Sequence, residues 1–286
     1  MSARSALTDE GLARLALSAL GEPGDPVIAG LVADHGPCLA LDRIRGGSAD
    51  SERYAARSAV LDVPRLLDIA AIVGARLVVP GDAEWPEGVD DLAAPPLVLW
   101  VKGTADLTEL RRRGVAVVGS RACTAYGERE ASDLASALTE RGFVVVSGAA
   151  FGIDAAAHRG ALAVGGPTVA VLACGIDRVY PAAHRELIAA IADQGAVVSE
   201  SPPGSAPMRQ RFLSRNRLIA TMTAATVVVE AGLRSGALNT TRTADDYGRL
   251  VGAYPGSVQS AASAGCHQAI RDQRAVLVTR AAEVVD

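Results

Sequence analysis

Hydrophobic and polar residues follow two different patterns along the chain, and the change comes near residue 75. Before it, apolar residues recur at helical spacing, beginning with an i, i+3, i+4, i+7 stripe at Leu12, and Gly- and Pro-rich turns separate the stretches. Further helical patterns cover residues 27–33, 37–44 and 55–70. The pattern predicts a small helical domain over residues 1–75, which either packs as a cap on the main domain or itself contacts nucleic acid.

From residue 76 to 286, short β-branched runs alternate with helical stretches. The expected strands are 77–79, 95–101, 115–118, 144–146, 168–172, 196–198, 226–229, 250–254 and 275–278. Helices are expected to include 131–138, 154–162, 183–192, 216–223 and 235–247. This alternation predicts an α/β fold whose doubly wound, mostly parallel Rossmann-like sheet forms a second domain. In such a sheet, ligands bind outside the carboxyl ends of the strands.

The turn from Gly119 to Gly127 leaves one of those strand ends and enters a helical pattern. Unpaired N–H groups and the macrodipole at a helix start attract anions, and Arg121 adds a full charge, so we expect this turn to bind a phosphate. The turn lacks the G-x-G-x-x-G spacing, which argues against a nicotinamide dehydrogenase, and the chain has no P-loop motif for ATP hydrolysis.

An arginine-rich stretch over residues 209–217 has the most unusual local composition. It holds four arginines and no acidic residue, and it lies between the strand ending near Glu200 and the next expected helix. A solvated surface is the alternative interpretation. Because arginine binds phosphate oxygens in a bidentate manner, the stretch suits a backbone longer than one phosphate. We expect Arg209, Arg211, Phe212, Arg215, Asn216 and Arg217 to contact it.

Few aromatic rings are available to stack on bases, because aromatic residues make up only 3% of the chain. Phe212 lies within the arginine-rich stretch, and Phe151 and Tyr180 follow neighbouring strands. Stacking contributes about 1–3 kcal/mol per base. Burial of each ring under the loops is the equally open alternative.

Composition narrows the function classes further. The formal net charge of −4 argues against a generally basic nucleic-acid-binding surface, so any such binding needs a local patch. The four cysteines show no metal-binding spacing. A membrane-spanning helix needs about eighteen consecutive apolar residues, and the sequence has no apolar run of that length. We therefore expect a cytoplasmic protein with no metal, no cofactor and no membrane partner.

Acidic residues at the strand ends have two possible roles. Glu200 and Glu230 either orient a ribose for glycosidic chemistry or fix arginines by ion pairing, and the arginine-rich surroundings favour ion pairing. Asp154 and His158 share one helical face and are candidates for a metal or acid–base pair, but the position of Asp154 favours a helix N-cap. No nucleophile-elbow motif surrounds any serine.

In order along residues 76–286, these motifs closely resemble those of the DNA processing protein A (DprA/Smf) family. The residues that carry the resemblance are Gly119-Ser120-Arg121, Ser147-Gly148, Gly152-Ile153-Asp154, Tyr180-Pro181, Ser199-Glu200, Phe212, Arg215-Asn216-Arg217, Glu230-Ala231, Ser235-Gly236 and Pro255-Gly256. Gly252-Ala253-Tyr254 departs from the usual family segment before Pro255.

The resemblance implies a single-stranded DNA-binding protein that protects incoming DNA and loads the recombinase RecA during natural transformation and recombination. It also implies a homodimer without catalytic activity and a SAM-like character for the helical domain. The implied DNA-binding residues are Ser120, Arg121, Gly148, Arg209, Arg211, Phe212, Arg215, Asn216 and Arg217. Supporting roles fall to Asp154, Glu200, Glu230, Ser235 and Gly236.

A nucleoside-monophosphate phosphoribohydrolase is the alternative function. In that enzyme Arg121 would bind the phosphate, and Glu200 or Glu230 would act on the glycosidic bond. The arginine-rich stretch exceeds what one phosphate requires, so we favour DNA binding.

Overall fold

The computed structural model describes residues 7–47 and 52–285. The N-terminal region consists of four helices: α1 (Asp9–Leu20), α2 (Pro26–Arg45), α3 (Glu52–Val60) and α4 (Val63–Ile72). Helix α2 is kinked at Gly36, the residue before Pro37, which agrees with the two separate patterns in the sequence. The pattern predicted over 55–70 is divided between α3 and α4, because Asp62 caps α4 and a proline follows in its first turn.

Nine strands form one sheet in the order β1-β2-β6-β5-β4-β3-β7-β8-β9. Their bounds are β1 Arg76–Val78, β2 Leu99–Gly103, β3 Gly114–Val118, β4 Val144–Ser147, β5 Thr168–Leu172, β6 Ala196–Ser199, β7 Ala225–Val228, β8 Leu250–Ala253 and β9 Val276–Leu277. Of the strand pairs formed by the described residues, only β1–β2 and β2–β6 are antiparallel. The predicted mostly parallel, doubly wound α/β fold is confirmed.

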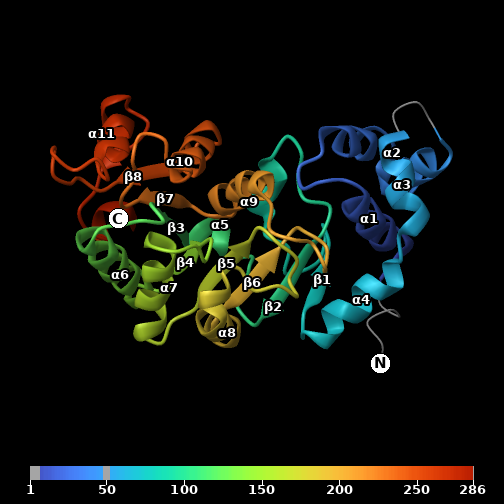
Figure 1. The fold of residues 1–286 in the computed structure, drawn as a ribbon, viewed down its shortest axis with the longest axis horizontal. Helices are drawn as coiled ribbons and strands as arrows, with labels where there is room; N and C mark the ends of the chain where they lie inside the picture. The colour runs from blue at the N-terminus through green and yellow to red at the C-terminus, as the bar shows by residue number, and fades with distance from the viewer. Residues whose placement is uncertain (1–6, 48–51, 286) are drawn as a thin grey trace.

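Helices cover both faces of the sheet (Figure 1). They are α5 (Leu110–Arg113), α6 (Ala125–Glu140), α7 (Ile153–Ala163), α8 (Arg185–Gln194), α9 (Arg209–Met222), α10 (Ala237–Asp246), α11 (Ala264–Arg271) and α12 (Ala282–Val285), with short 3₁₀ turns η3 (Glu87–Asp91) and η4 (Ala182–His184). Helices α6, α7 and α8 pack on one face, and α9, α10 and α11 on the other. Alternate strand residues point to the two cores, so the strands are buried on both sides.

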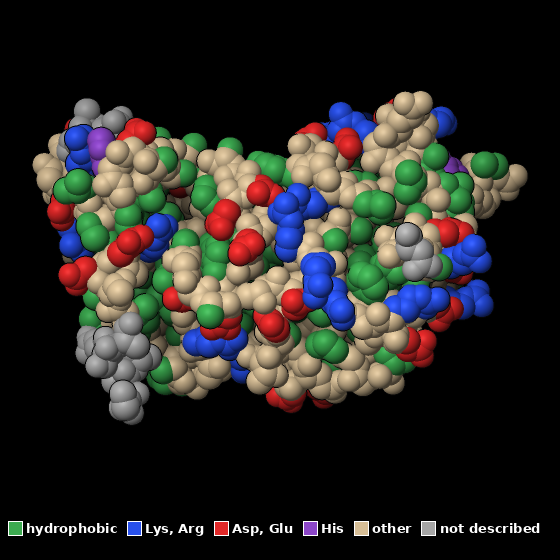
Figure 2. All heavy atoms as spheres, turned by 180° about the vertical axis from the view of Figure 1, so that it is seen from behind, with side chains coloured by type: hydrophobic (Ala, Val, Ile, Leu, Met, Phe, Trp, Pro, Cys, Tyr) green, Lys and Arg blue, Asp and Glu red, His purple; other side chains and the backbone are tan. Residues whose placement is uncertain are grey.

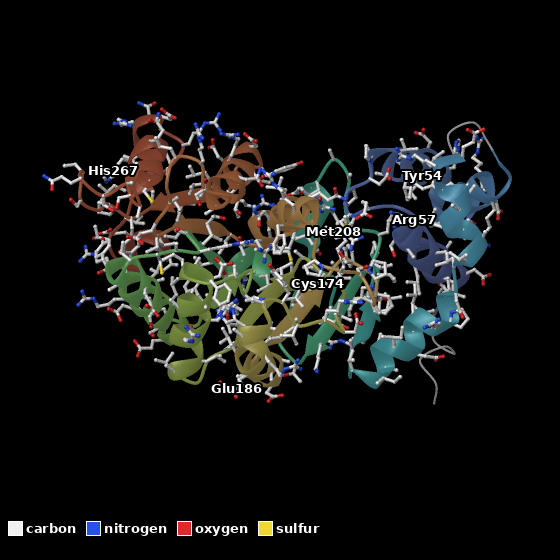
Figure 3. All side chains as sticks on the ribbon, in the orientation of Figure 1. Tyr54, Arg57, Cys174, Glu186, Met208 and His267 are labelled. Carbon is white, nitrogen blue, oxygen red and sulfur yellow. The ribbon has the colours of Figure 1, made fainter. Side chains whose placement is uncertain are left out.

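The helical region and α11 lie at opposite ends of the molecule. Figure 3 marks the first end with Tyr54 and Arg57 and the second with His267, and it places Met208, which precedes α9, between them. Among the described residues, no helix combines the length and apolar character needed to cross a bilayer.

Strand order reverses between β3 and β7. The chain proceeds from β3 through β4 and β5 to β6 on one side, and then returns to β7, β8 and β9 on the other. The carboxyl ends of β3 and β7 therefore flank a topological switch point, which is the preferred ligand site of such sheets. The turn after Val118 and the loop after Val228 both belong to it.

Most predicted elements are present, with shifted ends. The strand predicted from 95 begins at Leu99, because the prolines before it have no N–H for the ladder. Helix α9 begins at Arg209 instead of 216, so the arginine-rich stretch is helical and not a loop. The short helices α5, α11 and α12 had no expected counterpart.

Candidate nucleic-acid interface

Helix α9 distributes the arginine-rich stretch over different faces. Residues three or four positions apart share a helical face, and those two positions apart do not. Arg209 and Phe212 therefore point to one side, together with Asn216, and line a cleft. Arg211 and Arg217 point towards the N-terminal helices, where Arg211 pairs with Glu22 of the helical region and Arg217 with Glu200, the residue after β6. The structure does not bring the four arginines to one surface.

The cleft has a volume of about 590 Å³ and lies between α9, the turn after β3 and the start of α10. Of the predicted site residues, it is lined by Arg121, Asp154, Arg209, Phe212, Arg215, Asn216, Ser235 and Gly236. Ser120, Gly148, Arg211, Arg217, Glu200 and Glu230 do not line it. Several of these residues nevertheless hold cleft-lining residues in position.

Arg121 and two aromatic rings form a cluster on the cleft wall. The guanidinium carbon of Arg121 lies 4.7 Å from the ring centroid of Phe212, and the Tyr180 ring lies 5.5 Å from it. Tyr180 is 41% exposed, so the ring is not part of the core. Arg121 over the half-buried Phe212 ring offers a phosphate contact, and the exposed Tyr180 ring beside it offers a stacking surface.

Phe151, the third candidate ring, is exposed and lies on the loop after β4. Its ring packs edge-on against His184, with centroids 4.7 Å apart. His184 is buried, and its Nδ1 lies 2.9 Å from the carbonyl oxygen of Ala149. Phe151 is not among the residues that line the cleft.

Arg215 lies at the base of the cleft and is only 6% exposed. Its Nη1 donates to the carbonyl oxygen of Val171 at 2.6 Å, and its Nε has no partner. Burial lowers the guanidinium pKa, and the nearby charge of Asp154 opposes that shift. A Cβ on Gly148 would overlap the Arg215 guanidinium, so glycine at this position provides the space for it.

Asp154 supports the loop after β4. Its Oδ2 accepts from the backbone N–H groups of Gly148 at 3.1 Å and Ala150 at 3.4 Å. The prediction that Asp154 is a helix N-cap is wrong, because Gly152 takes that position and Asp154 falls within the first turn. Burial raises the pKa of Asp154, and the charge of Arg215 opposes that shift.

His158 and Asp154 do not form the metal or acid–base pair that their spacing allows. His158 is fully buried, and its Nδ1 lies 2.8 Å from Thr168 Oγ1, which itself donates to Val145. Burial lowers the pKa of His158 to about 3, so the ring is neutral near pH 7. Within residues 7–47 and 52–285, no cluster of three metal-ligating side chains occurs.

Glu230 occupies the start of helix α6. Its carboxylate accepts from the backbone N–H of Thr124 at 2.8 Å and from the hydroxyl of Thr124 at 2.6 Å. It also packs against Gly127, where any Cβ would overlap it. The protein's own carboxylate thus fills the place where we expected an external phosphate, and within the part of the chain that the structure describes Glu230 forms no ion pair with an arginine. This finding corrects two expectations from the sequence: an external phosphate at the start of α6, and an ion pair between Glu230 and an arginine.

The backbone of Ser120 holds the same turn. Its N–H donates to the carbonyl oxygen of Glu230 at 2.7 Å, and its carbonyl oxygen accepts from Ile153 at 3.2 Å. These contacts tie the ends of β3 and β7 to the start of α7. They leave the side chain of Arg121 exposed beside the cleft.

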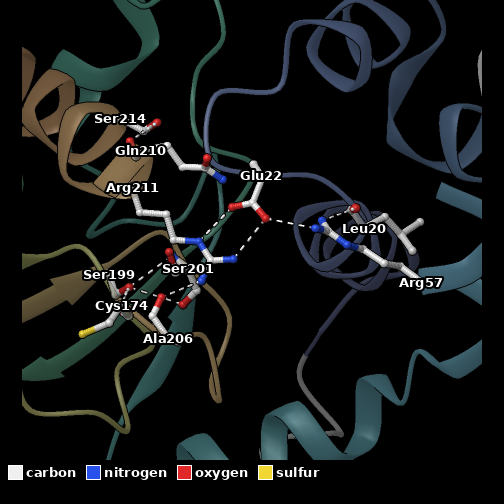
Figure 4. Close-up of polar contacts among 10 residues, drawn as sticks. All are labelled: Leu20, Glu22, Arg57, Cys174, Ser199, Ser201, Ala206, Gln210, Arg211 and Ser214. Carbon is white, nitrogen blue, oxygen red and sulfur yellow. Dashed lines mark hydrogen bonds and ion pairs between the residues drawn. The ribbon is translucent and has the colours of Figure 1, made fainter. Parts of the chain in front are cut away.

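Arg211 connects α9 to the helical region through Glu22 (Figure 4). Its Nε and Nη2 donate to the two oxygens of Glu22 at 2.8 and 3.0 Å, and Arg57 of α3 donates to the same carboxylate at 3.0 Å. The hydrogen bond from Arg211 is the main reason that the pKa of Glu22 is lowered.

Arg217 forms a second contact at the same junction. Its Nη2 donates to Glu200 Oε1 at 2.6 Å, and its guanidinium lies against Gly24 of the helical region. Burial raises the pKa of Glu200, and Arg217 opposes that shift. Glu200 thus pairs with an arginine, one of the two roles considered from the sequence.

Arg234 is a cleft residue that sequence reasoning missed. It lies on the loop after β7, immediately before Ser235 and Gly236, and it lines the cleft beside the start of α10. Arg121, Arg209 and Arg234 are all exposed, and none has an ion-pair partner among the described residues. The signal in the sequence was an arginine in the loop that follows a predicted strand, next to two residues already considered.

Positive charge is concentrated in the cleft, although the molecule as a whole is acidic. On the face shown in Figure 2, arginine side chains are interspersed with carboxylates and form no single basic area. In the cleft, four arginines face one carboxylate, that of Asp154. The local excess favours an anionic ligand at this place.

The chain matches the model of a known protein family over most of its length. The model of DNA recombination-mediator protein A matches residues 76–286. The putative DNA processing protein DprA of Mycobacterium tuberculosis is 49% identical over 284 residues, which cover 94% of this chain and 73% of that protein. The DNA processing protein DprA of Streptococcus pneumoniae is 41% identical over 201 residues, 70% of each chain.

Two solved structures resemble the fold. The X-ray structure of DprA from Streptococcus pneumoniae has a TM-score of 0.82 and 33% identity, and the match covers 98% of this chain and 97% of that one. A structure describing the single-stranded DNA binding mode of DNA processing protein A from Helicobacter pylori has a TM-score of 0.66 and 27% identity. That match covers 73% of this chain and 94% of the other.

Proposed function

The chain belongs to the DNA recombination-mediator protein A family, and on this premise we propose that its cleft binds single-stranded DNA. The observation that carries the proposal is the set of arginines in the cleft. Arg121 and Arg209 are exposed and unpaired within the described residues, Arg215 lies beneath them, and Phe212 and Tyr180 offer rings beside them. The Helicobacter pylori relative is described as binding single-stranded DNA.

A single strand fits this geometry better than a duplex does. An exposed ring contacts a base only when that base is unstacked, which a single strand permits at little cost. Phosphates supply sequence-independent affinity through the arginines. Binding is therefore expected to tolerate any sequence and to weaken steeply with salt.

Loading of the recombinase RecA onto the bound strand is the second part of the proposal. Its support is the family description as a recombination mediator. The proposal includes protection of incoming DNA, a homodimer and a cytoplasmic location. Faster RecA assembly on oligo-dT in the presence of this protein supports the loading role, and an unchanged rate contradicts it.

We also propose that the cleft binds without catalysis. Glu230, the residue considered for glycosidic chemistry, is 1% exposed and engaged by Thr124, and Glu200 is buried against Arg217. Neither carboxylate lines the cleft. Release of free base from nucleoside monophosphates by the purified protein contradicts this part.

Fluorescence anisotropy with labelled oligo-dT and the matching duplex at two salt concentrations tests the binding function. Arg121→Ala and Arg209→Ala are each expected to weaken oligo-dT binding roughly five-fold and to lower the log–log salt slope by about 0.7, the value for one phosphate of a single strand. Arg159→Ala, which removes an exposed arginine from α7, is the matched control. Unchanged affinity in the Arg121→Ala/Arg209→Ala double variant would overturn the proposal.

A further inference from the structure

A small pocket lies beside helix α8, on the face of the sheet opposite to α9 (Figure 1). Its volume is about 210 Å³, and it shares no lining residue with the cleft. We call it the lysine pocket, because Lys102, the only lysine in the sequence, lines it. Its walls are mostly aliphatic and consist of Val73, Ile176, Val179, Ile188, Ala189, Ala192 and Val197.

Lys102 is an unusual residue for its position in the sheet. It lies on β2, on the same side of the strand as Trp100, and pairs with Val197 of β6. Trp100 is fully buried in the core that α8 covers, whereas Lys102 is half-buried. A lysine in such a place covers apolar surface with its aliphatic stem and keeps its ammonium group in water. The pocket therefore combines an apolar wall with a cation at its mouth.

Two arginines add positive charge to the same pocket. Arg178 lies on the loop after β5, Arg185 is the first residue of α8, and both are exposed. Among the residues that the structure describes, none forms an ion pair with Lys102, Arg178 or Arg185. Asp177 supplies the one carboxylate among the described lining residues, and its Oδ1 accepts from the N–H of Gly204 at 2.8 Å. The excess of positive charge is complementary to an anionic partner.

The loop that carries Arg178 is held in place by hydrogen bonds. The N–H of Arg178 donates to the carbonyl oxygen of Gly175 at 2.9 Å, and the N–H of Gly175 donates to that of Ser205 at 2.9 Å. The bond between Asp177 and Gly204 joins the same two loops. The pocket is therefore largely preformed, which lowers the entropic cost of binding a ligand.

The size and the walls of the lysine pocket favour an amino-acid side chain over a nucleotide. Pockets for drug-sized ligands have volumes of about 300–1,000 Å³. The volume of about 210 Å³ is smaller than that range. The described lining residues include no aromatic ring, so a base finds no stacking surface there. One apolar side chain suits the aliphatic walls, and carboxylates on neighbouring residues suit the three cations.

We propose that the lysine pocket docks an acidic peptide segment of a partner protein. One apolar side chain of the segment enters the pocket, and carboxylates on either side of it pair with Lys102, Arg178 and Arg185. Burial of the side chain supplies most of the affinity, and the charges direct the segment to the pocket. The lysine pocket lies outside the cleft, so this interaction does not depend on the DNA-binding function.

Fluorescence anisotropy with the whole chain and a labelled peptide, in which aspartates flank one phenylalanine, tests the proposal. We expect saturable binding that weakens with salt and is lost when serines replace the aspartates. Lys102→Met and Arg178→Ala are each expected to weaken peptide binding roughly three-fold, as the loss of a partly exposed ion pair does. Ala189→Phe fills the pocket from an exposed position of α8 and is expected to weaken it roughly ten-fold.

A carbodiimide provides an independent measurement, because it couples a carboxylate to an amine that it contacts. The bound peptide is expected to be coupled to Lys102, the only lysine in the sequence. Mass spectrometry of the digested product is expected to find this coupling in the wild type and to find it absent from Lys102→Met.

Matched controls come from exposed residues outside the lysine pocket. Arg159→Ala removes an arginine from α7, and Ala56→Phe adds the same ring to α3. Both are expected to bind the peptide as the wild type does. Wild-type peptide affinity in the Lys102→Met/Arg178→Ala double variant and in Ala189→Phe overturns the docking site. Weaker oligo-dT binding in that double variant, with peptide binding unchanged, assigns the cations to the DNA and also overturns it.

Discussion

Single side chains decide which positive groups of the cleft remain available to a ligand. Glu230 fills the start of α6 with a carboxylate, so this helix end is closed although its sequence is suited to an anion. Arg215 remains under the cleft with an unpaired Nε, because Val171 and the charge of Asp154 satisfy it only in part. The positive charge available to an anion therefore lies in the arginine side chains of the cleft, Arg121 of the first turn included, and not in the backbone at the start of α6.

Gly148 is expected to affect the stability of the protein because it leaves room for the Arg215 guanidinium. A methyl group there would overlap the guanidinium, and overpacking of this kind costs about 1–3 kcal/mol. Gly148→Ala is therefore expected to lower the free energy of unfolding by about 2 kcal/mol in urea titrations. In an Arg215→Met background the same substitution is expected to cost less than about 1 kcal/mol, because Nη1 is gone.

The open position Gly30 provides the control for that measurement. Its Cβ would meet nothing within 4 Å in α2, so Gly30→Ala is expected to leave stability unchanged or raise it by up to about 1 kcal/mol. Equal costs of Gly148→Ala with and without Arg215 would show that the guanidinium is not what the glycine accommodates.

Among the elements, α9 shows best what the sequence predicts and what it does not. Its arginines and its place beside the carboxyl ends of the strands could be predicted from the sequence, because both depend on residue type and on order along the chain. Its start at Arg209 was not, because a polar run without apolar spacing gives no periodic signal. Once the stretch is helical, Arg209 lines the cleft and Arg211 points away from it, and only the folded structure shows that Arg211 pairs with Glu22.

Arg211→Ala is therefore expected to separate binding from stability. Arg211 is engaged by Glu22 and does not line the cleft, so oligo-dT affinity is expected to stay within about two-fold of the wild type. The free energy of unfolding is expected to fall by about 1 kcal/mol or less, since Glu22 remains partly exposed. Anisotropy and urea titration measure the two effects. A loss of affinity as large as that of Arg209→Ala would place Arg211 on the DNA.

For the whole molecule, the alternation of strands and helices predicted the fold class, because hydrophobic periodicity reports which faces are buried. It did not predict how the helical region meets the sheet. Leu15 of α1 and Leu67 of α4 belong to the same core cluster as Trp100 of β2 and Ile191 of α8. Such contacts join residues far apart in sequence, and neither periodicity nor composition specifies them.

The shared core predicts that the helical region and the sheet unfold together. Trp85 belongs to the core between the sheet and α9, and Trp100 to the core that the sheet shares with α1 and α4, whereas far-UV circular dichroism reports on all the helices. We expect the two signals to give coincident urea transitions, as a cooperative unit does. Leu15→Ala removes a fully buried side chain and is expected to shift both transitions together, by about 2–5 kcal/mol. Two separated urea transitions in this variant, with part of the helical signal lost in the first, would show instead that the helical region unfolds on its own.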